Sequence, residues 1–389
     1  MGNKKNFTTT AIQGGLFLSI ASWFSRGANI ITVLLLARLL TKEEYAISVF
    51  YLLLINFIDI AVMGLQAALI QKKELKEKEL DVAWTFENFI LKNTVAVFLY
   101  FNAQNICDFF EISKNYILGV KLISLTFVIK GIENLAITKL THELEFKKRA
   151  LLEITKGVVT GVVSVTVIFF WKNPLVVVIG VMTGQVGRVI TAYWLYPKIH
   201  YLNFNISILR DLLTFGSWIA AQNFLFILKA QIDKIFVSKI LGVDLLGVFQ
   251  LGNRVVVQST NDLTKVVSNT LFPIISKIQH ERERIIGALN KLYSILFIVA
   301  LPLLSYFFTN ADLLTVVLFG SKWLDEQVPL VIQLSAVAGV VKIFNVSSEP
   351  ILRGIGRPQL DFLGKLVSVS SVVLFCVFFL KTYLLKGLL

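Results

Sequence analysis

Long apolar runs alternate with short polar segments along almost the whole chain. Most runs contain about twenty residues, the length at which a helix crosses the roughly 30 Å hydrocarbon core of a bilayer. A segment in hydrocarbon has to pair its own backbone amides, so each run is expected to form a transmembrane helix. A hydropathy window predicts about eleven spans. They cover residues 14–36, 46–70, 83–106, 115–139, 151–171, 174–195, 214–241, 245–270, 287–309, 327–349 and 360–383.

The loops between these runs are short, so neighbouring helices are predicted to be antiparallel and the fold class to be all-α, a polytopic membrane helix bundle. Residues 37–46 and 238–247 are weakly similar, and each follows a span that contains a Ser-Trp pair. Internal similarity of this kind is typical of transporters built from two repeats. We therefore predict two pseudo-repeated lobes, residues 1–205 with six spans and residues 206–389 with five. The second lobe is expected to lack its twelfth helix.

Composition and charge support a membrane protein. Of the 389 residues, 56% are hydrophobic and only 16% are charged, whereas soluble domains contain about 25% charged residues. The net charge of +13 is dispersed over the loops, which indicates membrane orientation and not nucleic-acid binding. Lys and Arg are about twice as frequent on the side that carries residues 71–82 and 140–150, so these loops and the N-terminus are predicted to be cytoplasmic.

The chain has few residues of the types that catalyse reactions or bind metals. Its two cysteines, Cys107 and Cys376, lie far apart, and its three histidines fall in separate loops. A structural zinc site needs about four clustered ligands, so we expect no metal and no cofactor. The sequence contains no GxxxxGK(S/T) loop, which makes ATP hydrolysis by this chain an unfavourable interpretation. We expect a transport protein and not an enzyme.

Polar and charged residues recur at helical spacing inside the predicted spans. Each ionisable side chain at mid-bilayer costs at least about 2.5–3.5 kcal/mol, so these stripes need a role. They comprise Ser22, Arg26 and Asn29; Asn56, Asp59 and Gln66; Thr126, Lys130 and Glu133; Gln222, Lys229 and Asp233; Gln250, Arg254, Gln258, Asn261 and Lys265; and Lys342, Asn345 and Glu349. One interpretation is structural: the stripes form interhelical salt bridges and hydrogen bonds, with Lys229 and Asp233 as a local ion pair. Four charged residues near span ends are expected to snorkel to the interface: Glu87, Lys92, Glu153 and Lys156.

The other interpretation is functional. Arg26 and Arg254 have no acidic residue one helical turn away in sequence, and their spans occupy equivalent places in the two predicted lobes. The stripes then describe a wet, net-cationic cavity that suits an anionic substrate, because Arg and Lys bind phosphate strongly where water is scarce. The candidate substrate-binding residues are Arg26, Lys229, Arg254 and Lys130.

Motifs in the loops resemble a known family. The matching stretches are residues 37–45 (ARLLTKEEY), 64–84 (GLQAALIQKKELKEKELDVAW), 140–154 (LTHELEFKKRALLEI), 212–224 (LLTFGSWIAAQNF), 271–284 (LFPIISKIQHERER), 318–336 (LFGSKWLDEQVPLVIQLSA) and 351–360 (ILRGIGRPQL). They resemble the bacterial polysaccharide and O-antigen flippases (Wzx-type) of the multidrug/oligosaccharidyl-lipid/polysaccharide exporter superfamily. The resemblance runs from about residue 12 to residue 370. Thr41-Lys42 departs from it, because the family usually has Thr-Pro there.

The resemblance implies two six-helix lobes arranged as a V, in the cytoplasmic (inner) membrane. It implies a substrate, an oligosaccharide linked to undecaprenyl pyrophosphate, that is flipped between leaflets for lipopolysaccharide or exopolysaccharide biosynthesis. Glycan polymerases and glycosyltransferases are the implied partners, together with membrane lipids. Ion coupling through a carboxylate is also implied for the superfamily, and Asp59 and Asp233 are the candidates, with Asp233 at the family's aspartate position.

Two other classes of function stay open. A multidrug or organic-cation antiporter shares the architecture, but its cavity should be acidic or aromatic, whereas the predicted cavity is net basic. A membrane-embedded glycan enzyme would need an external acid–base pair, for which only residues 43–44 and 325–326 are available. These acidic residues belong to ordinary loop motifs, so we favour a flippase.

Overall fold

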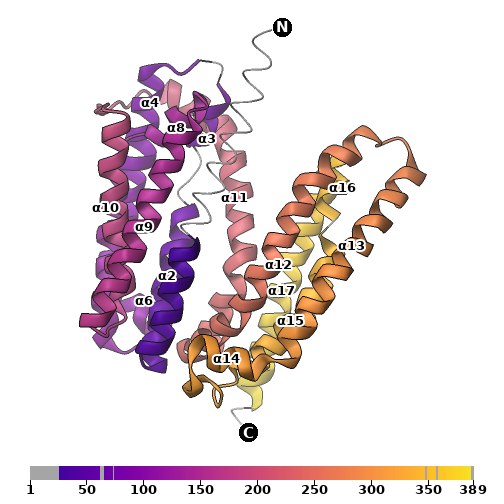
Figure 1. The fold of residues 1–389 in the computed structure, drawn as a ribbon. Helices are drawn as coiled ribbons and strands as arrows, with labels where there is room; N and C mark the ends of the chain where they lie inside the picture. The colour runs from indigo at the N-terminus through magenta and orange to yellow at the C-terminus, as the bar shows by residue number, and fades with distance from the viewer. Residues whose placement is uncertain (1–25, 62–64, 73, 347, 356–357, 387–389) are drawn as a thin grey trace. The chain divides into compact units, whose positions relative to one another are not determined.

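The computed structural model describes residues 26–61, 65–72, 74–346, 348–355 and 358–386, and every regular element within them is a helix (Figure 1). The all-α prediction is therefore confirmed. The chain divides into two compact units, Met1–Lys234 (unit 1) and Ile235–Leu389 (unit 2). The lobe boundary between residues 205 and 206 stays a prediction, because one helix, α11, runs from that point through the division between the units.

Unit 1 begins, in its described part, with a helix over residues 26–39. The elements that follow are α2 (Lys42–Ala61), α3 (Leu65–Gln71), α4 (Glu77–Ala83), the π-helix η1 (Trp84–Leu91), α5 (Lys92–Phe101), α6 (Ala103–Phe109), the short 3₁₀ turn η2 (Lys114–Tyr116), α7 (Ile117–Gly131), α8 (Ala136–His142), α9 (Phe146–Phe170), α10 (Leu175–Leu195) and α11 (Ile206–Ile240). Unit 2 contains α12 (Val243–Lys277), α13 (Arg282–Thr309), α14 (Ala311–Phe319), the 3₁₀ turn η3 (Ser321–Trp323), α15 (Val328–Asn345), α16 (Ser348–Gly354) and α17 (Pro358–Lys386).

Residues 14–25 of the first predicted span lie outside the described residues, and the described helices overlap the other predicted spans. In the described ranges, four helical stretches are long and apolar enough to cross a membrane alone: α9, α10, α13 and the stretch Val328–Leu352. The prediction of eleven spans goes beyond this strict count and stays a prediction. The predicted span 115–139 departs from a straight helix, because its residues form α7 and α8, which are bent by 50° at a short break.

The first polar loop ends in a capping box that starts α2. The backbone N–H of Glu44 donates to the Thr41 hydroxyl at 3.2 Å, and the Glu44 carboxylate accepts from the backbone N–H of Thr41 at 2.9 Å. This reciprocal pair satisfies two backbone donors at the helix start. The ARLLTKEEY motif therefore contains its own helix start signal, Thr41 and Glu44, without the proline that the family usually has.

Helices α9 and α10 pack closely along their length, and two glycines allow it. A side chain at Gly184 would place its Cβ 1.9 Å from the Thr160 hydroxyl and 2.8 Å from the carbonyl oxygen of Lys156. Gly180 makes the same approach to Ser164, also at 1.9 Å. Helices in lipid associate through such small residues spaced four apart, because dispersion contacts must replace the hydrophobic effect.

We expect Gly184→Val to destabilise unit 1 by about 1–3 kcal/mol, because the added methyl groups must push the backbones of α9 and α10 apart. The measurement is the thermal unfolding midpoint of the purified protein in detergent. Gly287→Val on α13 is the matched control, since nothing lies within 4 Å of a Cβ at Gly287. An equal loss of stability in both variants would contradict this account of the α9–α10 contact.

Candidate functional site

The break between α7 and α8 is the centre of a buried polar network in unit 1. Backbone groups left unpaired by a break inside a membrane span must find other partners, because hydrocarbon offers none. Two side chains of the α4–η1 helix, Trp84 and Asn88, donate to the carbonyl oxygen of Glu133 at 2.9 and 2.6 Å. The hydroxyl of Tyr193 on α10 donates to the carbonyl oxygen of Ile132 at 2.8 Å. The carbonyl groups of Ile132 and Glu133 at the break therefore have side-chain partners.

Asn134 connects the break to the end of α10. Its amide nitrogen donates to the carbonyl oxygens of Tyr196 at 2.6 Å and Ala192 at 3.4 Å, which lie in the last turn of α10. Its side-chain oxygen accepts from the backbone N–H of Ala136 at 3.1 Å, at the start of α8. One buried side chain thus caps the end of one helix and the start of another.

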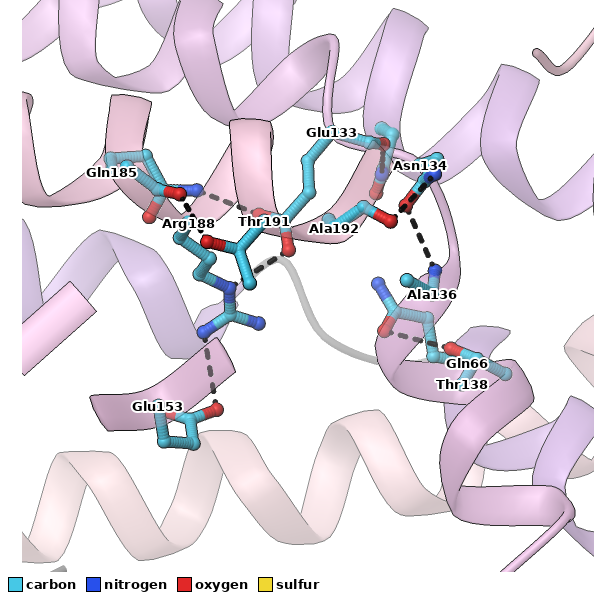
Figure 2. A network of polar contacts seen from close by, with 12 residues as sticks. Gln66, Glu133, Asn134, Ala136, Thr138, Glu153, Gln185, Arg188, Thr191 and Ala192 are labelled. Atoms are coloured by element: carbon cyan, nitrogen blue, oxygen red, sulfur yellow. Dashed lines mark hydrogen bonds and ion pairs between the residues drawn. The ribbon is translucent and has the colours of Figure 1, made fainter. Parts of the chain in front are cut away.

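The Glu133 side chain reaches in the opposite direction and forms the buried ion pair in Figure 2. Its carboxylate accepts from Nε of Arg188 at 2.8 Å and from the amide of Gln185 at 2.6 Å, both on α10. A second guanidinium nitrogen of Arg188 donates to Glu153 on α9 at 3.3 Å. The side chains of Arg188 and Glu133 are only 12% and 8% exposed. Removing one partner of such a pair is costly because it leaves the other charge buried.

Glu87 completes the network from the π-helix η1. Its carboxylate accepts from the backbone N–H groups of Leu65 at 2.7 Å and Gln66 at 3.2 Å, and from the Gln66 amide at 2.7 Å. Gln66 in turn accepts from the hydroxyl of Thr138 on α8 at 3.1 Å. The expectation that Glu87 snorkels to the interface is therefore wrong: it is 2% exposed, because it holds the start of α3. π-helical segments are rare and are frequent at functional sites.

The charges around the break balance. The acids are Glu87, Glu133 and Glu153, and the bases are Lys92, Lys130 and Arg188. Lys92 donates to the side chain of Asn88 at 2.6 Å, and the Lys130 ammonium lies 4.6 Å from the centre of the Phe127 ring. The ion pairs of Arg188 with Glu133 and Glu153 are a structural element, and they favour holding the break, α9 and α10 in one arrangement.

His200, in the segment between α10 and α11, also contacts the break. Its Nε2 accepts from the backbone N–H of Leu135 at 3.3 Å, so Nδ1 carries the proton and donates to Asp81 at 2.8 Å. Burial lowers the pKa of His200, and the partly opposing effect of the Asp81 carboxylate does not reverse this. The imidazole is therefore neutral at pH 7. It fixes the segment after α10 to α4, as does the 2.8 Å ion pair between Lys198 and Glu77.

The structure places the predicted site residues on five helices, with Lys229 and Asp233 both on α11. Arg26 lies half-buried on the helix over residues 26–39, Lys130 is buried on α7, and Arg254 lies half-buried on α12 in unit 2. The half-buried Asp233 on α11 accepts from the backbone N–H of Lys234 at 2.9 Å. The side chains of Asp59 on α2 and Lys229 on α11 lie outside the described residues. These residues stay candidates, and their roles are taken up below.

Part of the long stripe of α12 faces α15. Asn261 accepts from the ammonium of Lys342 on α15, which belongs to another predicted stripe. Eight residues earlier, Asn253, which lies beside the stripe, accepts from the hydroxyl of Ser335, also on α15, at 3.4 Å. Part of this stripe therefore serves packing within unit 2, as the structural interpretation expects.

Sequence reasoning missed Arg188, Gln185 and Asn134. The signal for Arg188 was present, because it is the lone charge in the apolar run 174–195. A single charge in such a run requires a partner. The partner's identity depends on which helix lies beside α10, and that information is not local in sequence.

Comparisons with known proteins agree with this fold. The profile of a family described as polysaccharide biosynthesis protein matches residues 35–328. The lipopolysaccharide biosynthesis protein WzxC of Escherichia coli (strain K12) is 26% identical over 380 residues, which are 96% of this chain and 73% of that protein. The teichuronic acid biosynthesis protein TuaB of Bacillus subtilis (strain 168) is 24% identical over 360 residues, 92% of this chain and 74% of TuaB.

Two solved transporter structures share the fold at low identity. The lipid II flippase MurJ in its inward closed conformation has a TM-score of 0.73 at 16% identity, covering 94% of this chain and 82% of MurJ. A multidrug resistance MATE family transporter in its inward-facing conformation has a TM-score of 0.67 at 14% identity, covering 88% of this chain and 83% of the transporter. With the helices of membrane-spanning length, these matches establish a multi-pass membrane protein with a transporter fold.

The Glu133–Arg188 pair gives a prediction about stability. We expect Arg188→Leu to destabilise unit 1 by about 3–5 kcal/mol, because Glu133 is left buried and unpaired. Adding Glu133→Gln should recover much of the loss, since the double variant buries no unpaired carboxylate at that position. Protein abundance in membranes and the unfolding midpoint in detergent measure both effects. Arg284→Leu is the control, because Arg284 forms an exposed pair with Glu281. If the double variant is less stable than Arg188→Leu, the pairing account is wrong.

Proposed function

We propose, on the premise that this chain belongs to the polysaccharide biosynthesis protein family, that it is a flippase for an oligosaccharide linked to undecaprenyl pyrophosphate. The protein moves this unit from the cytoplasmic to the periplasmic leaflet of the inner membrane, for lipopolysaccharide or exopolysaccharide synthesis. The observation that carries the proposal is the family match over residues 35–328 in a chain that shares its fold with a lipid II flippase. Glycosyltransferases supply the substrate and a glycan polymerase consumes it.

The chemistry of the carrier suggests which side chains bind it. A pyrophosphate is held best by guanidinium and ammonium groups that are partly shielded from water. Arg26 and Arg254 are half-buried, and we assign them direct contact with the pyrophosphate together with Lys229. Lys130 is 5% exposed and faces the Phe127 ring. The carboxylates around the break offset its charge, so we give it the smallest part in binding.

Transport uphill needs a coupling ion, and a partly buried carboxylate is the group that binds a proton or a cation. Asp233 and Asp59 are our candidates. Asp233 is half-buried on α11 and accepts a backbone hydrogen bond from Lys234. A coupling role can be told from a binding role by substitution, because loss of a coupling carboxylate changes how transport depends on the ion gradient.

A multidrug or organic-cation antiporter is the second candidate. It is supported by the shared fold with a MATE family transporter. The chain's net charge of +13 and its arginines inside spans disfavour a cationic substrate, because like charges repel in a medium of low dielectric constant. Two assays distinguish these functions. A flippase transports a lipid-linked glycan, whereas an antiporter exports an organic cation.

We expect residues 71–82 and 140–150 to face the cytoplasm, because Lys and Arg are concentrated in cytoplasmic loops. Single cysteines placed there, in a protein that lacks Cys107 and Cys376, should resist a membrane-impermeant thiol reagent in intact cells. Cysteines at Lys114 or Lys172, in loops on the other side, serve as the reactive control. Rapid labelling of cysteines within residues 71–82 and 140–150, with protection of those at Lys114 and Lys172, would show that the orientation is opposite to the predicted one.

We expect Arg26→Ala and Arg254→Ala each to lower glycan export about 10- to 100-fold while the protein stays in the membrane. A charge-assisted hydrogen bond contributes about 1.5–3 kcal/mol, and the pyrophosphate loses one in each variant. Lys at either position should restore part of the export, less so at a bidentate contact. Surface glycan and membrane protein level are measured together, with Arg284→Ala as the control.

The competing structural role predicts another pattern. If Arg26 or Arg254 instead pairs with Asp59 or Asp233, the Ala variants lower protein abundance, and a second substitution at the paired aspartate restores it. Full glycan export by both Ala variants at normal protein level would exclude the binding role. If the Ala variants export a normal amount of glycan but no longer export organic cations, the result would favour the antiporter.

A further inference from the structure

The imidazole of His200 is enclosed, and both of its ring nitrogens form hydrogen bonds. The side chain is 0% exposed. Its Nδ1 donates to the Asp81 carboxylate at 2.8 Å, and its Nε2 accepts from the backbone N–H of Leu135 at 3.3 Å. The indole of Trp84 stacks on the imidazole with the ring centres 5.9 Å apart, which keeps the ring in this orientation. Only the neutral imidazole with its proton on Nδ1 can form both hydrogen bonds.

These two bonds join three parts of unit 1, at the end where α3, α4 and α8 lie together in Figure 1. His200 belongs to the segment between α10 and α11, Asp81 to α4, and Leu135 to the break between α7 and α8. The same segment is also attached to η1, because the backbone N–H of Asn203 donates to the Thr85 hydroxyl at 3.0 Å. His200 therefore links the segment that leads into α11 to the backbone of the break.

Protonation of His200 changes its two bonds in opposite directions. A proton on Nε2 points at the backbone N–H of Leu135, so two donors face each other and this hydrogen bond is lost. The bond from Nδ1 to Asp81 stays and becomes stronger, because a charged donor then faces a carboxylate. Acid therefore releases the break from the segment but does not release the segment from α4.

The surroundings of the imidazole set the pH at which it is protonated. Burial is the largest effect and lowers the pKa of His200 from its ordinary value of 6.5. The carboxylates of Asp81 and Glu77 on α4 raise this pKa, and Lys198 in the same segment lowers it, each by less than burial does. The unfolded chain therefore binds this proton at a higher pH than the folded chain. The contact with Leu135 is fully stable above about pH 6.5 and is lost as the pH falls towards the lowered pKa.

The other elements packed around the ring add little net charge. Their charged and titratable groups are Glu133, which is paired with Arg188; Lys139 and Glu143 on α8, which are paired with each other; Arg210 and Asp211 at the exposed start of α11; and the phenol of Tyr196, whose ring centre is 6.4 Å away. Each charge in this set has an opposite charge beside it. The response to acid is therefore a property of the imidazole and its two partners.

His142, on α8 at the same end of unit 1, forms a hydrogen bond that does not depend on its charge. Its Nε2 lies 2.8 Å from the carbonyl oxygen of Lys72, so this nitrogen donates. A second proton goes to the other ring nitrogen and leaves the bond with Lys72 in place. His200 differs because it accepts from a backbone N–H, which makes its contact with the break sensitive to protonation.

We propose that His200 is a proton-sensitive latch: it holds the segment between α10 and α11 to the α7–α8 break while its imidazole is neutral, and it releases the break when the imidazole is protonated. The segment leads into α11, whose Leu212 packs with Leu80 and Leu135 in one buried cluster. Release therefore loosens the break where the start of α11 packs against it. The latch responds to the pH of the aqueous phase at this end of unit 1, whichever substrate is transported.

The test is hydrogen–deuterium exchange of the purified protein in nanodiscs, measured in overlapping peptides that resolve the backbone amide of Leu135. Exchange is compared at about pH 8 and about pH 5, the range in which histidine changes its charge, after correction for the intrinsic pH dependence of amide exchange. Loss of one hydrogen bond changes a local opening equilibrium by up to about tenfold. In the unchanged protein we therefore expect the corrected exchange of Leu135 to be about tenfold faster at the lower pH.

Two variants separate the titration of His200 from its structural role. His200→Gln keeps an amide oxygen for Leu135 and an amide N–H for Asp81 but cannot be protonated, so its corrected exchange should be the same at both pH values. Asp81→Asn removes the carboxylate that stabilises the imidazolium, so the midpoint of the acid response should move to a lower pH. His142→Gln is the matched control and should keep the full response.

Equal corrected exchange of Leu135 at the two pH values in the unchanged protein would overturn the proposal. A full acid response in His200→Gln, or loss of the response in His142→Gln, would also overturn it, because a different group would then be titrating. If His200→Gln does not fold, Asp81→Asn decides the matter: a midpoint that stays in place or moves to a higher pH would contradict the latch.

Discussion

The rest of unit 1 depends on one constraint: a backbone carbonyl or N–H inside hydrocarbon must have a partner. The break between α7 and α8 creates several groups that the helices cannot pair. Trp84, Asn88, Asn134 and Tyr193 supply partners from the α4–η1 helix, the break itself and α10. Because these side chains have to arrive from different helices, satisfying the break fixes how those helices pack.

The charges follow from the same constraint. A carboxylate such as Glu133 can be buried beside the break only with a cation on a neighbouring helix, and Arg188 provides it from α10. Arg188 also contacts Glu153, so α9 joins the same arrangement. The close approach of α9 and α10 at Gly180 and Gly184 brings these helices near enough for one guanidinium to serve both carboxylates. Small residues at the contact and a buried ion pair therefore support each other.

Much of the fold could be predicted from sequence, whereas little of the network could. The positions of the helices could be predicted from the apolar runs, because the length of an apolar run can be determined from that segment alone. The break at residues 132–135 was not predicted, since Glu133 was interpreted as part of a polar stripe on one straight helix and Asn134 carried no signal of its own. Glu87 was assigned to the interface because its position near a span end is local information. Its burial depends on the backbone of α3, which only the tertiary structure brings to it.

The balance of charge at the break bears on how an anionic substrate could be attracted. Glu87, Glu133 and Glu153 are offset by Lys92, Lys130 and Arg188, and the field of such a compact neutral set decays quickly with distance. The chain's net charge of +13 must then arise outside the network, in the loops and in stripes such as that of Arg254. Steering of the anionic substrate that we propose then falls to those residues. The network, in contrast, keeps unit 1 rigid, so that any movement during transport takes place outside the network.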